Sequence, residues 1–164
     1  MSSIRDEIVA LIPRLRRFAH GLAGTIDRGD DLVQVACERA LSRGYQWQKG
    51  TRLDSWMYTI IRNAHIDQVR AEVSHTDKLQ QWNATRSETG ERPHEGESEL
   101  LLGSIDEAMQ QLSDSHREIL MMVCVEGLSY KEVAGILDIP VGTVTSRLVR
   151  ARHQLMAVLD DGDS

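Results

Sequence analysis

The stretch that decides the fold class is LSYKEVAGILDIPVGTVTSRLVRARHQL, which covers residues 128–155. Ser129 and Glu132 have the spacing of a capping box, so a helix is expected to begin there. Residues 138–140 are expected to form a short turn, because the proline at position 140 is tolerated at the start of the next helix. Two helices joined by a turn of this length predict a helix-turn-helix, a motif that binds DNA.

The second helix of this motif, expected over residues 141–159, has one apolar face and one basic face. It contains three arginines and no acidic residue, so its amino end suits a phosphate or the edge of a base. A solvated basic face is the plainer interpretation, but the position within a complete helix-turn-helix favours DNA contact. The residues of the basic face are Thr143, Arg147, Arg150 and Gln154.

The rest of the chain is also patterned for helices. Apolar residues recur at helical spacing over 4–22, 30–41 and 55–70, and no stretch sustains the alternation of a strand. A further helix is expected to begin at residues 113–115 (SDS), with Glu118 as the capping-box partner of Ser115. The sequence therefore predicts an all-α fold.

Composition changes in the middle of the chain. From residue 72 to residue 99 there are few aliphatic side chains, and small or polar residues dominate, which is typical of a linker. We therefore expect two small helical domains, residues 1–71 and 104–164, joined by a flexible acidic linker over 72–103. Such a linker has an average span of about 30 Å, close to one turn of DNA.

Charge is unevenly distributed along the 164 residues. The formal net charge of −6 argues against a general nucleic-acid coat or a binder of anionic membranes. Locally, however, the net charge is +3 over 1–71, −9 over 72–140 and +3 over 141–159. Both segments that are candidates for DNA contact are basic, and their modest charge predicts weak DNA binding by the free chain.

A cluster of aromatic and basic residues lies in the N-terminal half. Aromatic faces stack on unpaired bases while basic groups follow the phosphates, so the loop at 47–53 is predicted to contact nucleic acid. A hydrophobic plug in that loop is the alternative. Trp56 is expected in the core, because its spacing matches Ile60 and Ala64. The residues of the cluster are Tyr45, Trp47, Lys49, Arg52, Trp56, Tyr58 and Arg62.

The second helix carries an acidic strip. Asp30 and Asp31 stand at its expected start, where negative charge is favourable, so capping alone accounts for the pair. Asp31, Gln34 and Glu38 nonetheless share one outer face with Val35, and a strip of this kind suits a basic partner helix. A docking surface and a solvated face are the two interpretations.

The sequence carries no pattern of catalysis or of membrane insertion. The six histidines have no metal-ligand spacing with cysteine or carboxylate, and there is no phosphate-binding glycine loop or nucleophile elbow. We therefore expect no catalytic residue, no metal and no cofactor. No apolar run approaches about 18 residues and no secretory signal is visible, so a cytoplasmic protein is expected.

Two blocks of sequence, in a fixed order, resemble one known family. Residues 30–34 (DDLVQ), 56–63 (WMYTIIRN) and 66–67 (ID) are similar to conserved region 2 of the extracytoplasmic-function sigma factors of the sigma-70 family. Residues 112–134 and 142–152 are similar to region 4 of the same family. The resemblance covers both ends of the chain and excludes only the expected linker and the termini.

This resemblance implies a bacterial RNA polymerase specificity subunit for transcription initiation. Region 2 would dock on core RNA polymerase and hold the −10 element of promoter DNA, and region 4 would enter the major groove at the −35 element. An anti-sigma factor is the implied regulatory partner. The implied polymerase-binding residues are Asp30, Asp31, Gln34 and Arg39. The implied −10 contacts are Trp47, Lys49, Arg52, Arg62, Asn63 and Arg70. The implied −35 contacts are Thr143, Ser146, Arg147 and Arg150.

Three positions or segments refine the resemblance. Val35 stands where the family often has an acidic residue, and Thr145 stands where it often has a basic one. Residues 49–51 (KGT), ahead of the helix that contains Trp56, are similar to the general-stress-response group of the family.

Two other functions stay open at this point. A stand-alone helix-turn-helix regulator would account for the C-terminal half but would leave the N-terminal blocks without a role. A sigma-like decoy would sequester an anti-sigma factor and would never bind DNA.

Overall fold

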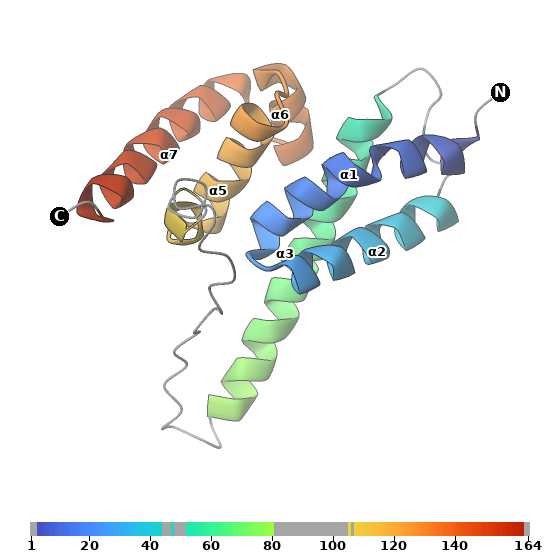
Figure 1. Cartoon of the computed structure of the whole chain (residues 1–164), viewed down its shortest axis with the longest axis horizontal. Coiled ribbons are helices and arrows are strands. Elements are labelled where there is room, and N and C mark those ends of the chain that lie inside the picture. The colour runs from blue at the N-terminus through green and yellow to red at the C-terminus, as the bar shows by residue number, and fades with distance from the viewer. Residues whose placement is uncertain (1–2, 44–46, 48–51, 81–104, 106, 163–164) are drawn as a thin grey trace, which may run out of the picture.

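The computed structural model describes residues 3–43, 47, 52–80, 105 and 107–162, and the regular structure in this part of the chain is helical (Figure 1). The expected all-α fold is thereby confirmed. The elements are α1 (Ile4–Ala23), α2 (Ile26–Ser42), α3 (Leu53–Gln80), α5 (Asp114–Leu120), the π-helix η3 (Met121–Val125), α6 (Tyr130–Leu137) and α7 (Val141–Gly162).

Caps set the boundaries of the first two helices. Ser3 forms a capping box with Asp6, and Gly24 ends α1 in the left-handed conformation with a φ of 89°. Thr25 then caps α2, which begins at Ile26 rather than at Asp30. The predicted start is too late, because an acidic pair is typical of a first turn and here lies in the second.

α3 is longer than the sequence predicted. It runs to Gln80, whereas the apolar periodicity ends near Arg70, so residues 72–80 of the expected linker are helical. Glu72 forms an ion pair with Arg28 of α2, which anchors this extension. A polar composition indicates exposure but does not exclude a helix, since Glu and Gln are good helix formers. The remainder of the expected linker, residues 81–103, lies outside the described residues.

The helix α5 has a different cap from the one predicted. The side chain of Ser113 accepts a hydrogen bond from the backbone N–H of His116, so Ser113, and not Ser115, caps α5. Glu118 takes no part in this cap and instead contacts the N-terminal half. α5 then widens into the π-helix η3, which is followed by Gly127 with a φ of 68°.

The predicted helix-turn-helix is confirmed. Both hydrogen bonds of the capping box between Ser129 and Glu132 are present at the start of α6. Asp138 adopts the left-handed conformation, with a φ of 56°, in the turn to α7. α7 begins at Val141, as expected, and extends three residues beyond the predicted end at Leu159.

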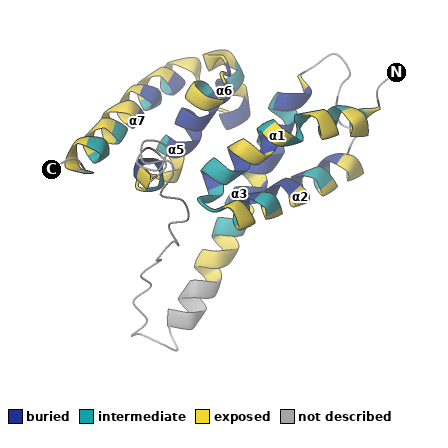
Figure 2. Cartoon of the chain, in the orientation of Figure 1, coloured by how far each residue is buried: buried dark blue, intermediate teal, exposed yellow. Residues whose placement is uncertain are grey.

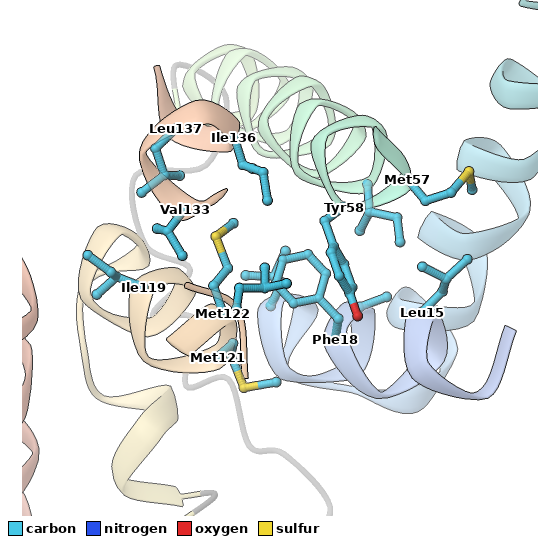
Figure 3. Packing of buried hydrophobic residues seen from close by; sticks show 14 of the residues in the cluster. Leu15, Phe18, Met57, Tyr58, Ile119, Met121, Met122, Val133, Ile136 and Leu137 are labelled. Carbon is cyan, nitrogen blue, oxygen red and sulfur yellow. The ribbon is translucent and has the colours of Figure 1, made fainter. Parts of the chain in front are cut away.

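Buried hydrophobic residues of the two halves, whose positions are dark blue in Figure 2, belong to one cluster. The rings of Phe18 in α1 and Tyr58 in α3 meet edge to face with centroids 4.9 Å apart. Met121 and Met122 of η3 lie beside these two rings (Figure 3). Met121 can pack closely against α1 because position 21 is a glycine; a Cβ there would lie 2.6 Å from the Sδ of Met121. In this structure the C-terminal helices therefore pack directly on α1 and α3.

Candidate polymerase and promoter interface

The outer face of α7 presents the predicted −35 contacts. Buried Val144, Leu148 and Ala151 hold the helix against the rest of its domain, and the opposite side is exposed (Figure 2). Thr143 and Arg147 are half-buried, whereas Ser146 and Arg150 are exposed. The spacing of these four residues places them on one side of the helix. Two guanidinium groups and two hydroxyls suit phosphates and base edges in a major groove.

The outer face of α2 presents only part of the predicted polymerase-docking strip. Asp31 and Gln34 lie on this face, and the Gln34 side chain donates a hydrogen bond to Glu38 at 3.4 Å. Val35 is exposed beside them. The result is an acidic, partly apolar surface that is open to a partner.

The other two predicted docking residues are engaged within the N-terminal half. Asp30 accepts hydrogen bonds from Arg16 at 3.0 Å and pairs with His20 at 2.7 Å. The bonds from His20 and Arg16 lower the pKa of Asp30. Arg39 forms an ion pair with Asp67 of α3, with Nη2 and Oδ2 3.2 Å apart. Asp30 and Arg39 thus link α2 to its neighbours α1 and α3.

Four of the predicted −10 contacts fall into two groups, one exposed and one held in ion pairs. Asn63 and Arg70 are exposed on α3. Arg62 donates to Glu118 of α5 through Nε at 2.9 Å, and Arg52 forms ion pairs with Asp54 and with Glu132 of α6. These two arginines are therefore paired with carboxylates of the C-terminal half.

The two tryptophans of the aromatic and basic cluster, Trp47 and Trp56, lie in similar surroundings. Trp56 is partly buried against the core, as predicted. Trp47 is also partly buried against the core, and its Nε1 is buried without a hydrogen-bond partner among the described residues. This position is the one expected for a hydrophobic plug in the loop, which was the alternative to base contact. Lys49 lies outside the described residues.

Glu126 was not predicted from the sequence to have any role. Its side chain is fully buried, and its carboxylate accepts two hydrogen bonds from Arg17 of α1, at 2.8 and 3.0 Å. The hydroxyl of Tyr58 donates to the same carboxylate at 2.6 Å. Burial and the bond to Glu126 raise the pKa of Tyr58. An acidic residue directly after the apolar run of residues 119–125 was the available signal, because a carboxylate in such a run needs a partner.

Glu118 is in a similar position. Burial raises the pKa of its carboxyl group, and the hydrogen bond and charge of Arg62 oppose that rise. A buried carboxylate with an arginine partner is well suited to holding two elements together, since removal of either partner leaves the other charge uncompensated.

The described residues hold no group of three or more His, Cys, Asp or Glu that could bind a metal ion. Within the same part of the chain, no helix is long and apolar enough to cross a membrane.

Comparison with known proteins identifies the family. Residues 8–62 match the family model described as the sigma2 domain of PhyR, and residues 102–155 match the model of sigma-70 region 4. Over 160 residues the chain is 38% identical to the ECF RNA polymerase sigma factor EcfG of Rhodopseudomonas palustris, an alignment that covers 96% of this chain and 85% of the relative. The chain belongs to the extracytoplasmic-function (ECF) family of RNA polymerase sigma factors. This ECF sigma factor is also 27% identical to SigW of Bacillus subtilis, over 90% of its own length and 84% of that relative.

Solved structures agree with this assignment. The chain superimposes on the sigma factor RpoE of Bartonella quintana, crystallised with the anti-sigma factor NepR, with a TM-score of 0.80, 29% identity and 96% coverage of both chains. It also matches CnrH, solved in complex with the cytosolic domain of CnrY, with a TM-score of 0.64 and 21% identity over 96% of this chain and 89% of that one. The second match supports the fold alone.

Membership of the family settles the general function. The chain is a sigma factor. Sigma factors direct the promoter-specific initiation of transcription by RNA polymerase, and the family is not a family of enzymes. A stand-alone helix-turn-helix regulator does not fit, because the similarity to EcfG extends through the N-terminal half.

Proposed function

We propose that this ECF sigma factor docks on core RNA polymerase through α2, contacts the −10 element through α3, and reads the −35 element through α7. The observation that carries the proposal is the full-length similarity to EcfG combined with the accessible acidic face of α2 and basic face of α7. These two faces have opposite charge, as a polymerase-docking surface and a DNA-binding surface require.

Asp31 and Gln34 are the centre of the proposed polymerase contact. Both side chains lie on the outer face of α2, and Val35 adds an exposed apolar side chain beside them. A carboxylate and an amide at this spacing suit arginine or lysine side chains on a partner helix. Asp30 and Arg39 support this face from within, because they tie α2 to α1 and α3.

The proposed −35 contact uses Thr143, Ser146, Arg147 and Arg150. The buried side of α7 fixes the helix on α5 and α6, so the opposite side is presented as a rigid surface. The proposed −10 contact uses Asn63 and Arg70, which are already exposed, together with Arg52 and Arg62 once they leave their glutamate partners.

An anti-sigma factor is the proposed regulatory partner. The similarity to RpoE of Bartonella quintana, which was crystallised with the anti-sigma factor NepR, supports this assignment, and together with the similarity to EcfG it supports a place in the general-stress-response group. We propose that the protein acts in the cytoplasm, where RNA polymerase transcribes DNA, and that it has no catalytic activity of its own.

Run-off transcription with purified core polymerase on a pool of promoters tests the proposal. We expect transcripts that core polymerase alone does not make. Transcription by the wild type and its loss in R147A/R150A would support a functional sigma factor. An R147A/R150A variant that transcribes normally, or a wild type that stimulates no transcript, would favour a decoy that only sequesters an anti-sigma factor.

A further inference from the structure

We propose that Asp54 is a positioning residue for the −10 contact, because its buried carboxylate holds the guanidinium of Arg52 in one orientation before promoter DNA binds. This inference rests on the proposed −10 contact through Arg52 and adds the residue that orients it. The side-chain and backbone groups that bind the Asp54 carboxylate belong to Arg14, Arg52 and Ser55, all in the N-terminal half of the chain.

Arg52 stands directly before α3, and its backbone is fixed there. Its carbonyl oxygen accepts a hydrogen bond from the backbone N–H of Trp56 at 3.3 Å, which is a bond of the first turn of the helix. The side chain, in contrast, is 55% exposed. A long exposed side chain samples many rotamers unless a further contact restrains it. The backbone alone therefore does not determine where the guanidinium of Arg52 lies.

The carboxylate of Asp54 supplies the restraining contact. Arg52 donates to Oδ1 of Asp54 through Nε at 3.1 Å and to Oδ2 through Nη2 at 2.6 Å. Two parallel hydrogen bonds between a guanidinium and a carboxylate fix the plane of the guanidinium as well as its distance. Asp54 therefore sets the orientation of Arg52, which a single ion pair at the surface would not do.

Asp54 is itself held in place. Its side chain is only 9% exposed, and it accepts hydrogen bonds from Nη2 of Arg14 in α1 at 3.1 Å and from the backbone N–H of Ser55 at 2.8 Å. Burial alone would raise the pKa of Asp54, but the hydrogen bonds from Arg52, Ser55 and Arg14 outweigh burial and lower that pKa. A charged acceptor with fixed geometry is what the orientation of an arginine requires.

The contact with Asp54 leaves one terminal nitrogen of Arg52 available to a second anion. Nη1 takes no part in the bonds to Asp54, and in this structure it pairs with Glu132 of α6. An anion can therefore bind at Nη1 while Nε and Nη2 remain on Asp54. A DNA phosphate is such an anion, so the oriented guanidinium can present Nη1 to the −10 strand when Glu132 is no longer its partner.

The advantage of this arrangement is that Arg52 is ordered before DNA binds. Binding normally includes the cost of ordering each long side chain that takes part in the contact. Asp54 removes that cost for Arg52, because the side chain is already restrained in the free chain. The enclosed carboxylate also faces two guanidinium groups, those of Arg14 and Arg52, so the three side chains together carry a positive charge.

Asp54→Asn tests the proposal in the holoenzyme. The probe is the promoter fragment that gives the strongest run-off transcript with the wild type, and titration of the holoenzyme gives the apparent affinity. Removal of a negative charge near DNA should tighten binding on electrostatic grounds alone. We expect the opposite, a loss of roughly two- to tenfold in affinity, because Arg52 must now be ordered on binding. An affinity equal to or tighter than that of the wild type would overturn the inference.

Arg52→Ala shows whether Asp54 acts through Arg52. Arg52→Ala should weaken promoter binding, and Asp54→Asn should add no further loss, because the residue that it positions is already absent. Losses that add would indicate a general effect of Asp54 on the structure and would overturn the inference. Asp160→Asn makes the same change in net charge at an exposed position at the end of α7 and should leave the affinity unchanged.

Arg52→Lys is a second variant that does not disturb a buried group. Lysine keeps the charge at this exposed position, but an ammonium group cannot bind two carboxylate oxygens in a fixed plane. We expect promoter affinity to fall roughly two- to tenfold although the charge is retained. If Arg52→Lys binds the promoter as tightly as the wild type, orientation by Asp54 has no effect on the contact and the inference is wrong.

The orientation of Arg52 can also be measured in the free chain by nuclear magnetic resonance. Because the Nε–H of Arg52 donates to Asp54, its proton should exchange slowly with water, and its signal is assigned by its absence in Arg52→Lys. Glu132→Gln is the matched comparison, since Glu132 contacts a different nitrogen and glutamine still completes the capping box of α6. We expect slow exchange to persist in Glu132→Gln and to be lost in Asp54→Asn. The reverse result would refute the positioning role.

The proposed function fails separately. A wild type that supports transcription and is weakened by Arg52→Ala, while Asp54→Asn keeps full affinity, would overturn this inference and leave the −10 contact standing. Unchanged promoter binding in Arg52→Ala would instead show that the −10 role of Arg52 is wrong, and the inference would fall with it.

Discussion

The hydroxyl of Tyr58 donates a 2.6 Å hydrogen bond to the carboxylate of Glu126, although the two residues belong to different halves of the chain. Tyr58 is completely buried, and the side chain of Glu126 is too. Because Arg17 shares the same carboxylate, one acidic residue joins α1, α3 and η3. The two halves are therefore joined by contacts that lie within the buried core.

Tyr58→Phe removes one donor from a buried carboxylate while keeping the ring that packs on Phe18. We expect a loss of about 1.5–3 kcal/mol in the free energy of unfolding, the range for a hydrogen bond to a charged group. Chemical denaturation followed by circular dichroism measures it. Tyr130→Phe, at an exposed position on α6, is the control and should change stability by less than about 0.5 kcal/mol. Equal effects of the two variants would contradict the role given to Tyr58.

Asp31→Arg reverses the charge at the centre of the proposed polymerase contact. We expect affinity for core polymerase to fall by tenfold or more, since a like charge opposed to a basic partner costs on the order of 1.4 kcal/mol or above. Stability should stay within about 1 kcal/mol of the wild type, because the side chain lies at the surface. Asp160→Arg, at the end of α7, is the matched charge reversal. Unchanged affinity in Asp31→Arg would remove Asp31 from the docking surface.

Arg147→Ala and Arg150→Ala test the −35 surface one residue at a time. If the arginine contacts a base, its removal should weaken binding of the cognate −35 duplex by about 1–3 kcal/mol and relax specificity. If it contacts a phosphate, its removal should weaken binding of cognate and scrambled duplexes by the same factor. Titration against cognate and scrambled duplexes at two salt concentrations separates these cases. Arg152→Ala, exposed on a different side of α7, is the control. A larger effect at Arg152 would place the DNA-binding face elsewhere.

Gly29→Ala and Gly135→Ala are chemically identical changes with opposite expected results. A Cβ at Gly29 would lie 2.8 Å from the Cα of His20, so α1 and α2 must separate, at a cost of about 1–3 kcal/mol. A Cβ at Gly135 meets nothing within 4 Å, and alanine in this helix should stabilise by about 0.5–1 kcal/mol. Denaturation midpoints compare the two. Destabilisation of similar size at both sites would contradict the close packing at Gly29.

We expect the buried His65 to make the free energy of unfolding decrease at acidic pH. Burial lowers the pKa of His65 in the folded chain, with Asp114, Arg117, Arg28 and Glu72 as its charged neighbours. The unfolded chain therefore takes up a proton that the folded chain does not, and stability falls as pH drops below about 6.5.

Denaturation midpoints measured between about pH 7.5 and pH 5.5 report this component. A single histidine changes the free energy of unfolding by at most about 1.4 kcal/mol per pH unit. His65→Leu should flatten the pH profile, whereas His153→Leu, at an exposed position, should leave it unchanged. A profile that His65→Leu leaves as steep as the wild type would show that another group is responsible.

Much of the candidate site could be predicted from local patterns. The basic face of α7 follows from helical spacing and from the Ser129 capping box, and the accessible part of the α2 strip follows from the same kind of reasoning. These features depend on residues three to seven positions apart, so a linear pattern is sufficient to reveal them. Two predicted boundaries were wrong. α2 begins at Ile26 and not at Asp30, because the acidic pair lies in its second turn. α3 runs to Gln80 and not to Arg70, because polar residues are compatible with both a helix and a linker.

The partners of the charged residues were beyond the reach of such patterns. Glu118 lies 56 positions from Arg62, and Glu126 lies 109 positions from Arg17 and 68 from Tyr58. Glu118, predicted to be a helix cap, is a bridge between domains, and two of the arginines predicted to bind DNA are already paired with glutamates.

By itself, then, the sequence determined the helices, the helix-turn-helix and the family, because these depend on spacing along one helix and on motif order. Only the tertiary structure decided that the two halves close on one another. That outcome depends on ion pairs between buried carboxylates and arginines and on the packing of Met121 against Gly21. The partners in each contact are far apart in the sequence, so no local pattern predicts them.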